Sequence, residues 1–161
     1  MPKQNCLLEV LSDEDIEWLI SAGEVIQICK DSILIEEGKS GDSLYIVLGG
    51  VFTVNLAILQ NQSVAHVLSG DILGEMSFVD ERPPSATVQA KEDAEVFRIY
   101  SQVLSEKLEN DFAFASRFFR GTCVVLADRL RDTLNPQNTP QMPTSSQSRI
   151  ENIISRIRRG Q

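Results

Sequence analysis

Apolar residues recur at helical spacing near the start of the chain. Within residues 11–20, Ile16, Leu19 and Ile20 share one helical face, and Ser12 precedes an acidic first turn. A serine cap and early acidic residues stabilise a helix start, because they satisfy free N–H groups and complement the helix dipole. The pattern predicts a short helix that ends near Gly23.

Beyond Gly23 the apolar period falls to two, which is typical of strands. Apolar runs lie at 25–28, 33–35, 44–48, 51–54 and 64–68, and a further pair of strands is predicted at 86–90 and 95–100. Gly- and Asp-rich turn signals separate the earlier runs. This spacing predicts an antiparallel sandwich or barrel. A short helix predicted at 74–79 interrupts it, and such Gly-led interruptions commonly hold ligand sites.

Helical spacing returns at Ser101, and a long helix is predicted over residues 111–134. One stripe of this helix is apolar at three- and four-residue spacing: Phe112, Phe119, Cys123, Leu126 and Leu130. Phe118, Val124 and Val125 lie on other sides, so the helix has more than one face to bury. Two alternatives stay open: a single wide core-facing stripe, or a homodimer through residues 112–134.

The C-terminal part differs in composition from the rest. Residues 1–134 are expected to form one domain, and residues 135–148, with three Pro among Gln, Asn, Ser and Thr, a flexible linker. Residues 149–161 form a basic amphipathic tail, because four Ile share one helical face between Arg residues. The tail has four alternative fates: an anionic membrane surface, a partner's groove, the acidic body of its own chain, or no specific role.

Charge argues against nucleic acid as a partner. The chain has 161 residues, with 15 Lys and Arg against 23 Asp and Glu, and a net charge of −8. Residues 149–159 carry four Arg and one Glu, so the tail holds +3 and the remainder −11. An acidic body repels phosphate backbones, so we expect no DNA binding.

The reactive side chains in the sequence form no recognisable catalytic motif. His66 is the only histidine, so no hydrolytic triad can be proposed, and the acidic pairs at 36–37 and 80–81 lie in turns. Cys6, Cys29 and Cys123 fit neither a disulfide framework nor a zinc site. We therefore expect no catalytic residue, no metal and no cofactor. A polar N-terminus without a secretory signal, and no long apolar run, predict a cytoplasmic chain, with peripheral membrane attachment through the tail as an alternative.

The most informative segment is residues 69–88. Gly74 lets the backbone approach a ligand closely, and a one-turn helix from Glu75 directs free N–H groups outward, where they can hold a phosphate. Glu75 can at the same time accept hydrogen bonds from a vicinal hydroxyl of a sugar. The alternative is a barrel loop in which Glu75 only caps its own helix.

Three stretches carry a resemblance to a known family: residues 33–50, residues 70–78 with Gly-Asp-Ile-Leu-Gly-Glu, and residues 126–131. Through them residues 11–134 resemble the cyclic nucleotide-binding domains of the catabolite activator protein, the protein kinase A regulatory subunits and cyclic-nucleotide-gated channels. The resemblance implies a mainly β fold with flanking helices: an eight-stranded antiparallel β-barrel of the jelly-roll type, with an N-terminal helix and a long C-terminal helix.

The resemblance also implies a ligand and its contacts. The segment from Gly74 to Thr87 matches the family's phosphate-binding cassette, and its ligand would be cyclic AMP or cyclic GMP. The positions implied to bind it are Gly74, Glu75, Met76, Ser77, Arg82, Ser85, Ala86 and Thr87. By this resemblance, Gly74 and Glu75 would meet the ribose hydroxyl, and Ser85 and Ala86 would meet the cyclic phosphate.

One position departs from the family's pattern. Pro84 stands where the family carries the arginine that pairs with the phosphate, and proline supplies neither a charge nor an N–H group. Arg82 lies two residues earlier, and either turns into the vacant place or remains an exposed turn residue.

The expected function is that of a stand-alone regulatory module of the bacterial type. Ligand capture at 74–87 would shift the population between two packings of the helix 111–134. The 27 residues after Leu134 are too few for the DNA-binding domain of related transcription factors. The alternative is a divergent barrel that no longer binds cyclic nucleotide and acts as a dimerisation or adaptor element, attached through its tail to a membrane or a protein.

Overall fold

A computed structural model describes residues 7–60, 62–135 and 144–160 of the chain. The chain forms two compact units. A strand unit holds residues 22–104, and a helical unit holds residues 1–21 together with 105–161.

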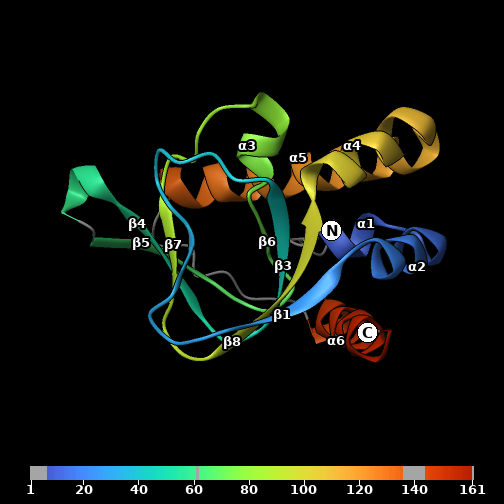
Figure 1. The fold of residues 1–161 in the computed structure, drawn as a ribbon, viewed down its shortest axis with the longest axis horizontal. Helices are drawn as coiled ribbons and strands as arrows, with labels where there is room; N and C mark the ends of the chain where they lie inside the picture. The colour runs from blue at the N-terminus through green and yellow to red at the C-terminus, as the bar shows by residue number, and fades with distance from the viewer. Residues whose placement is uncertain (1–6, 61, 136–143, 161) are drawn as a thin grey trace. The chain divides into compact units, whose positions relative to one another are not determined.

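The strand unit holds eight strands within its described residues. They are β1 (Glu24–Ile28), β2 (Ile33–Ile35), β3 (Ser43–Gly49), β4 (Phe52–Leu56), β5 (Gln62–Val67), β6 (Ile72–Leu73), β7 (Thr87–Ala90) and β8 (Ala94–Tyr100). Their pairing is antiparallel, in two four-stranded sheets of order β1-β8-β3-β6 and β2-β7-β4-β5 (Figure 1). The predicted mainly β, jelly-roll fold is therefore confirmed.

Alternating side chains of these strands form the core of the strand unit. Its buried cluster is Val47, Phe52, Val67, Leu73, Val88, Ala90, Ala94 and Val96. Residues two apart on a strand point to the same face, so Ala94 and Val96 of β8 enter this cluster together. The period of two in the sequence thus reports the core correctly.

Strand β6 is an element that the hydrophobic pattern does not predict. It has only two residues, which is too short for an alternation to show, and it pairs with β3 through Tyr45 with Leu73 and Ile46 with Ile72. This pairing fixes the position of the segment that follows, from Gly74 onward.

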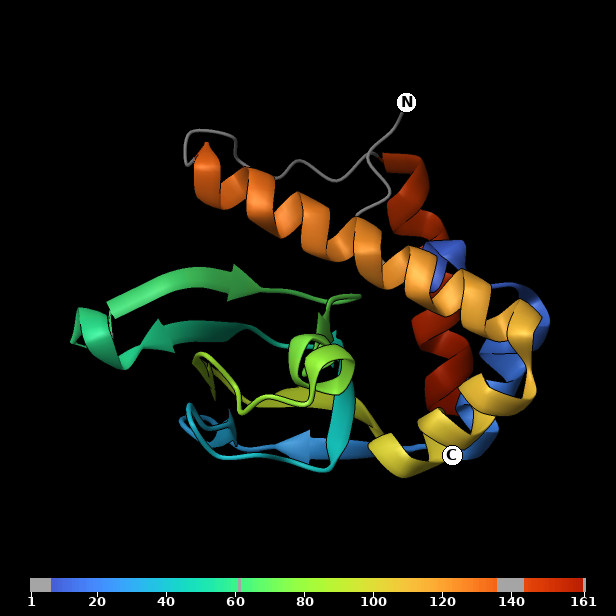
Figure 2. The same cartoon turned by 90° about the horizontal axis from the view of Figure 1, so that it is seen from above.

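The β4–β5 hairpin ends in a helical turn. This turn, η1 (Ala57–Leu59), forms the tip of the hairpin (Figure 2).

The helical unit is built from helices at both ends of the chain. They are α1 (Leu7–Val10), α2 (Asp13–Ala22), α5 (Phe112–Leu134) and α6 (Thr144–Arg159). Helix α4 (Ser101–Asn110) contributes its residues from 105 onward. None of the helices in the described residues is long and apolar enough to cross a membrane.

Helix α5 has two apolar faces, as the sequence predicts. Its buried positions are Phe114, Phe118, Gly121, Thr122 and Val125. Gly121 packs closely against α1: an added Cβ would lie 2.6 Å from Leu7 Cδ1, so a larger residue here would displace the Leu7 side chain. Most of the stripe singled out in the sequence is exposed: Phe112 is 81% exposed and Leu130 60%, Phe119 and Cys123 are exposed as well, and Leu126 is half-buried.

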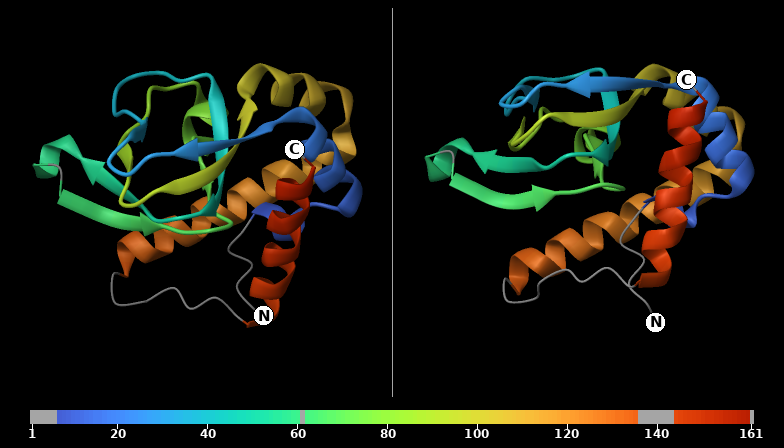
Figure 3. Two further views of the ribbon diagram at one scale, coloured as in Figure 1. Left: turned by 60° about the horizontal axis from the view of Figure 1, so that its bottom comes forward. Right: turned by 90° about the horizontal axis from the view of Figure 1, so that it is seen from below.

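Helix α6 folds onto helices of its own chain. It begins at Thr144, so the last five residues of the predicted linker are helical, whereas residues 136–143 lie outside the described residues. Its four Ile, at 150, 153, 154 and 157, are all buried, and it lies beside α1 and α2 (Figure 3). Arg156 lies 3.5 Å from Asp13 Oδ1 and 3.7 Å from Glu17 Oε1, so the basic tail meets the acidic first turns of α2.

Candidate functional site

The cassette begins at a sharp turn between β6 and α3 (Glu75–Asp80). Gly74 has φ 87°, in the left-handed region, and a Cβ added there would lie 3.1 Å from the carbonyl oxygen of Ser43. Its carbonyl oxygen accepts a hydrogen bond from Phe78 N at 3.1 Å, which closes the first turn of α3. The backbone therefore requires glycine at this position.

Glu75 follows this turn and is the buried acidic residue of the cassette. Only 3% of its surface is exposed. A buried carboxylate is costly unless it is hydrogen-bonded, so its placement needs polar partners. Glu75 is therefore a buried acidic side chain directly after the turn at Gly74, and it already has an interaction within the protein.

The next residues of α3 are less buried than Glu75. Met76 is exposed, Ser77 is half-buried, and the Ser77 carbonyl oxygen accepts a hydrogen bond from Glu81 N at 2.9 Å. Glu81 has φ 59° and ends the helix. The short helix thus turns one acidic side chain inward and presents an apolar one at its surface.

Arg82 lies at the surface of the turn after α3. Its side chain is 83% exposed, and Nε is 4.0 Å from Asp80 Oδ2. Its backbone N–H donates to Asp80 Oδ1 at 3.0 Å. Of the two alternatives for Arg82, this geometry is that of the exposed turn residue.

The end of the cassette is tied to the loop after β2. Gly38 N donates to the carbonyl oxygen of Pro84 at 2.9 Å, and Glu37 N donates to Thr87 Oγ1 at 3.1 Å. Glu37 in turn accepts from Ala57 N at 2.9 Å through Oε2. The sequence analysis does not find this connection, because Glu37 and Thr87 are 50 residues apart and share no local pattern.

The eight predicted site residues, all in the strand unit, differ in burial: five are buried or half-buried and three are exposed. Gly74, Glu75 and Ser77 lie buried or half-buried at the start of the cassette, and Ala86 and Thr87 are half-buried at its end. Met76, Arg82 and Ser85 are exposed.

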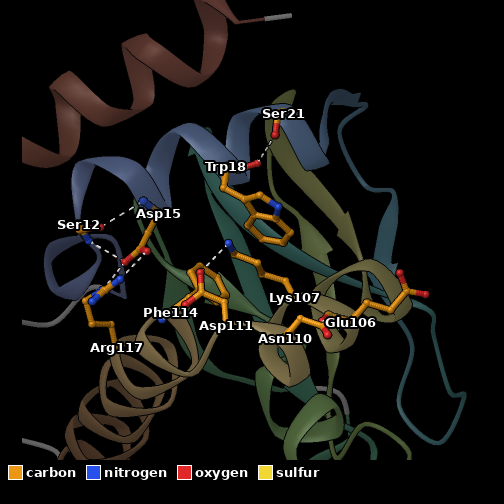
Figure 4. Close-up of polar contacts among 10 residues, drawn as sticks. All are labelled: Ser12, Asp15, Trp18, Ser21, Glu106, Lys107, Asn110, Asp111, Phe114 and Arg117. Carbon is orange, nitrogen blue, oxygen red and sulfur yellow. Dashed lines mark hydrogen bonds and ion pairs between the residues drawn. The ribbon is translucent and has the colours of Figure 1, made fainter.

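A second polar cluster, in the helical unit, fixes the start of α5 against α2 (Figure 4). Arg117 Nε lies 2.5 Å from Asp15 Oδ2 and its NH2 group lies 2.9 Å from Oδ1, a bidentate ion pair. Ser12 and Asp15 cap α2 reciprocally, since Ser12 N donates to Asp15 Oδ2 and Asp15 N donates to Ser12 Oγ. Burial raises the pKa of Asp15, but the bonds from Arg117 and Ser12 outweigh it and lower the pKa overall.

Lys107 joins α4, α5 and α2 in the same cluster. Its Nζ lies 2.8 Å from Asp111 Oδ2, and 5.2 Å and 5.4 Å from the ring centres of Trp18 and Phe114 (Figure 4). Asp111 caps α5 by accepting from Phe114 N at 2.9 Å. The bond from Lys107, followed by that from Phe114 N, lowers the pKa of the Asp111 carboxyl.

The histidine and the described cysteines belong to parts of the chain outside residues 74–87. His66 is exposed on β5, and Cys29 and Cys123 are exposed and free, whereas Cys6 lies outside the described residues. The described residues bring together no group of His, Cys, Asp and Glu that could hold a metal.

Comparison with known proteins places the cassette in a family. The model of the cyclic nucleotide-binding domain matches residues 25–111, which is more than half of the chain. The chain belongs to the cyclic nucleotide-binding domain family. Domains of this family and fold are regulatory binding modules.

The chain is also similar to parts of longer proteins. The chain is 30% identical over 106 residues to a cGMP-dependent protein kinase of Eimeria tenella, which covers 65% of this chain and 10% of the kinase. It is 28% identical over 137 residues to an uncharacterized NTE family protein of Mycobacterium tuberculosis, which covers 85% of this chain and 22% of that protein. The chain thus spans about a tenth and about a fifth of these relatives.

A solved structure shares the fold over most of both chains. The cyclic nucleotide-binding domain from Methylobacillus flagellatus KT superposes with a TM-score of 0.73 at 26% identity, covering 85% of each chain.

Proposed function

We propose that the chain is a regulatory module that binds a small ribose-bearing ligand in its cassette, residues 74–87, and transmits the binding event through α5. The observation that carries this proposal is the buried Glu75 directly after the left-handed Gly74. A carboxylate held next to this turn accepts a hydrogen bond from a ribose hydroxyl, which is the 2′-hydroxyl in a 3′,5′-cyclic monophosphate. Ser85, Ala86 and Thr87 face the rest of the ligand in this proposal.

Chain continuity supports the choice of α5 as the output. Strand β8 ends at Tyr100, α4 begins at Ser101, and only Asp111 separates α4 from α5. The Asp15–Arg117 and Lys107–Asp111 pairs hold one packing of α5 against α2. A ligand that favours a second packing must offset these contacts, and it shifts the population only by its difference in affinity for the two.

The site assignment is tested by restoring the family's arginine. Pro84→Arg keeps the carbonyl oxygen that accepts from Gly38 and adds a cation at the phosphate position. We expect the variant to bind cyclic AMP or cyclic GMP in calorimetric titration, and Glu75→Ala in that background to abolish the binding. The matched control is Glu92→Ala, an exposed acid outside the cassette, which should leave affinity unchanged. Binding that survives Glu75→Ala would overturn the assignment.

A second function is favoured by the exposed stripe of α5. Phe112, Phe119 and Leu126 repeat at seven residues, and so do Cys123 and Leu130. A seven-residue apolar repeat is typical of a two-stranded coiled coil, so a second copy of the chain is the proposed partner of this stripe. In the adaptor alternative this dimer is the function itself. Attachment of the tail to an anionic membrane or a protein would require α6 to leave its place, because its Ile face is buried.

A further inference from the structure

Within the described residues 74–87, Arg82 is the one basic residue, and its side chain is exposed. Position 84 is a proline, and its carbonyl oxygen already accepts the N–H group of Gly38. Arg82 lies within the cassette and Lys39 in the loop that hydrogen-bonds to its end, and both side chains are mostly exposed. Each lies beside a carboxylate: Arg82 4.0 Å from Asp80 and Lys39 2.9 Å from Glu36.

The charge around the cassette is also negative. Residues 70–87 carry four acidic residues and one basic residue. The loop of residues 36–42, which hydrogen-bonds to the end of the cassette through Gly38 and Glu37, carries three acidic residues and one basic residue. Such a field disfavours an anion and does not act on a neutral ligand.

Helix α3 cannot replace the missing charge. It has only six residues, so its N-terminus offers little dipole, and Glu75 occupies its first turn with a carboxylate. The feature that remains is the buried acidic side chain of Glu75, whose carboxylate oxygens are acceptors for a sugar hydroxyl.

We infer that the ligand of this cassette is an uncharged nucleoside rather than a cyclic nucleotide. The inference rests on the proposed function, since it names the ligand class of the same site. A charge-assisted, bidentate arginine bond to phosphate contributes about one to two decades of affinity. A cyclic nucleotide loses that contribution here and meets an acidic surface, whereas a nucleoside makes its ribose contact with Glu75 and brings no charge to that surface.

The test is calorimetric titration of the full chain with adenosine, guanosine, cytidine and uridine, each beside its 3′,5′-cyclic monophosphate. We expect one nucleoside to bind about tenfold or more tightly than its cyclic monophosphate. Pro84→Arg should tighten the cyclic monophosphate by about ten- to a hundredfold and leave the nucleoside nearly unchanged. Arg82→Gln tests whether Arg82 turns toward the phosphate position. It should change neither the affinity for the nucleoside nor that for the cyclic monophosphate.

Three results would overturn the inference, and each has a different consequence for the proposed function. Tighter binding of a cyclic monophosphate to the unmodified chain, weakened by Arg82→Gln, would identify Arg82 as the anchor and leave the sensor function standing. Cyclic nucleotide binding gained only by Pro84→Arg, without nucleoside binding, would overturn the nucleoside and keep the site. No binding of any of these ligands by either protein would overturn both.

Discussion

At the scale of single residues, Asp15 shows how an acidic group acquires a structural role. Its carboxylate caps α2 through Ser12 and holds both nitrogens of the Arg117 fork, 102 residues away. Because Asp15 is buried, its charge is tolerated only while these donors remain. The same pair fixes α5 to α2, so the residue belongs to the helix packing that the proposed signal must change.

Asp15→Asn should destabilise the chain by roughly 1–3 kcal/mol at neutral pH, because a buried charged hydrogen bond is lost. The folded-state pKa of Asp15 is lowered, so its contribution is complete above the unfolded pKa of about 3.9 and disappears as the pH falls through the folded pKa. In urea unfolding experiments from pH 7 to pH 3, the free energies of unfolding of the variant and of the unmodified chain should therefore approach each other as the pH falls.

The matched control is Glu14→Gln, an exposed acid in the same first turn of α2. It should change the free energy of unfolding by less than about 0.5 kcal/mol. If the difference in free energy of unfolding between Asp15→Asn and the unmodified chain stays constant down to pH 3, the role assigned to the ionised carboxylate is contradicted.

At the scale of elements, α6 is part of the helical unit although its composition is that of a surface peptide. Its four Ile are buried, Arg156 meets Asp13 and Glu17, and Arg149 donates to the Leu11 carbonyl oxygen at 3.0 Å. An isolated helix of this length is marginal in water, so these contacts are what keep it helical.

Ile153→Ala should lower the free energy of unfolding by about 2–3 kcal/mol, since it removes a buried side chain from the α6 face. The value belongs to the lower part of the usual range because a terminal helix can detach instead of leaving a cavity. Asn152→Ala, on the exposed face of the same turn, should be neutral or slightly stabilising. Equal unfolding midpoints for the two variants would contradict the packing of α6.

The exposed stripe of α5 gives a test of the proposed dimer. In a parallel coiled coil the stripe of one copy meets the same stripe of the other, which brings Cys123 opposite its counterpart. In a Cys6→Ser, Cys29→Ser variant, copper phenanthroline should produce a disulfide-linked dimer on a non-reducing gel, and dithiothreitol should reverse it. Leu130→Lys should abolish the product and give a monomer in sedimentation. Cross-linking that persists in Leu130→Lys would argue against this stripe as the dimer contact.

At the scale of the whole molecule, the sequence predicts the architecture better than the contacts between distant segments. The alternation in β3 and β8 and the helical stripes of α5 are local patterns, so their elements follow from the sequence. The two residues of β6 are too few for a pattern, and Thr144 to Ser148 have a linker-like composition although they start α6. The bonds between Glu37 and Thr87 and between Asp15 and Arg117 join residues far apart in sequence, and only the fold brings them together.

Part of the candidate site is predicted in the same way. Gly74 and Glu75 stand out because a glycine before a short helix has a physical meaning, and the structure confirms the turn. The significance of Pro84 follows only from the family's pattern, since nothing local marks the place of a missing arginine. The exposure of Arg82 depends on Asp80 and the turn after α3.

The central claim is that the segment from Gly74 to Thr87 captures a ribose-bearing ligand and that α5 responds. Amide hydrogen exchange tests it most directly, measured on the unmodified chain with saturating adenosine or guanosine and on Pro84→Arg with saturating cyclic AMP or cyclic GMP. We predict slower exchange at residues 74–87 and altered exchange over residues 111–134 in the ligand-bound protein, and neither change in the corresponding Glu75→Ala variants. Unchanged exchange at residues 74–87 under every one of these conditions would contradict the account.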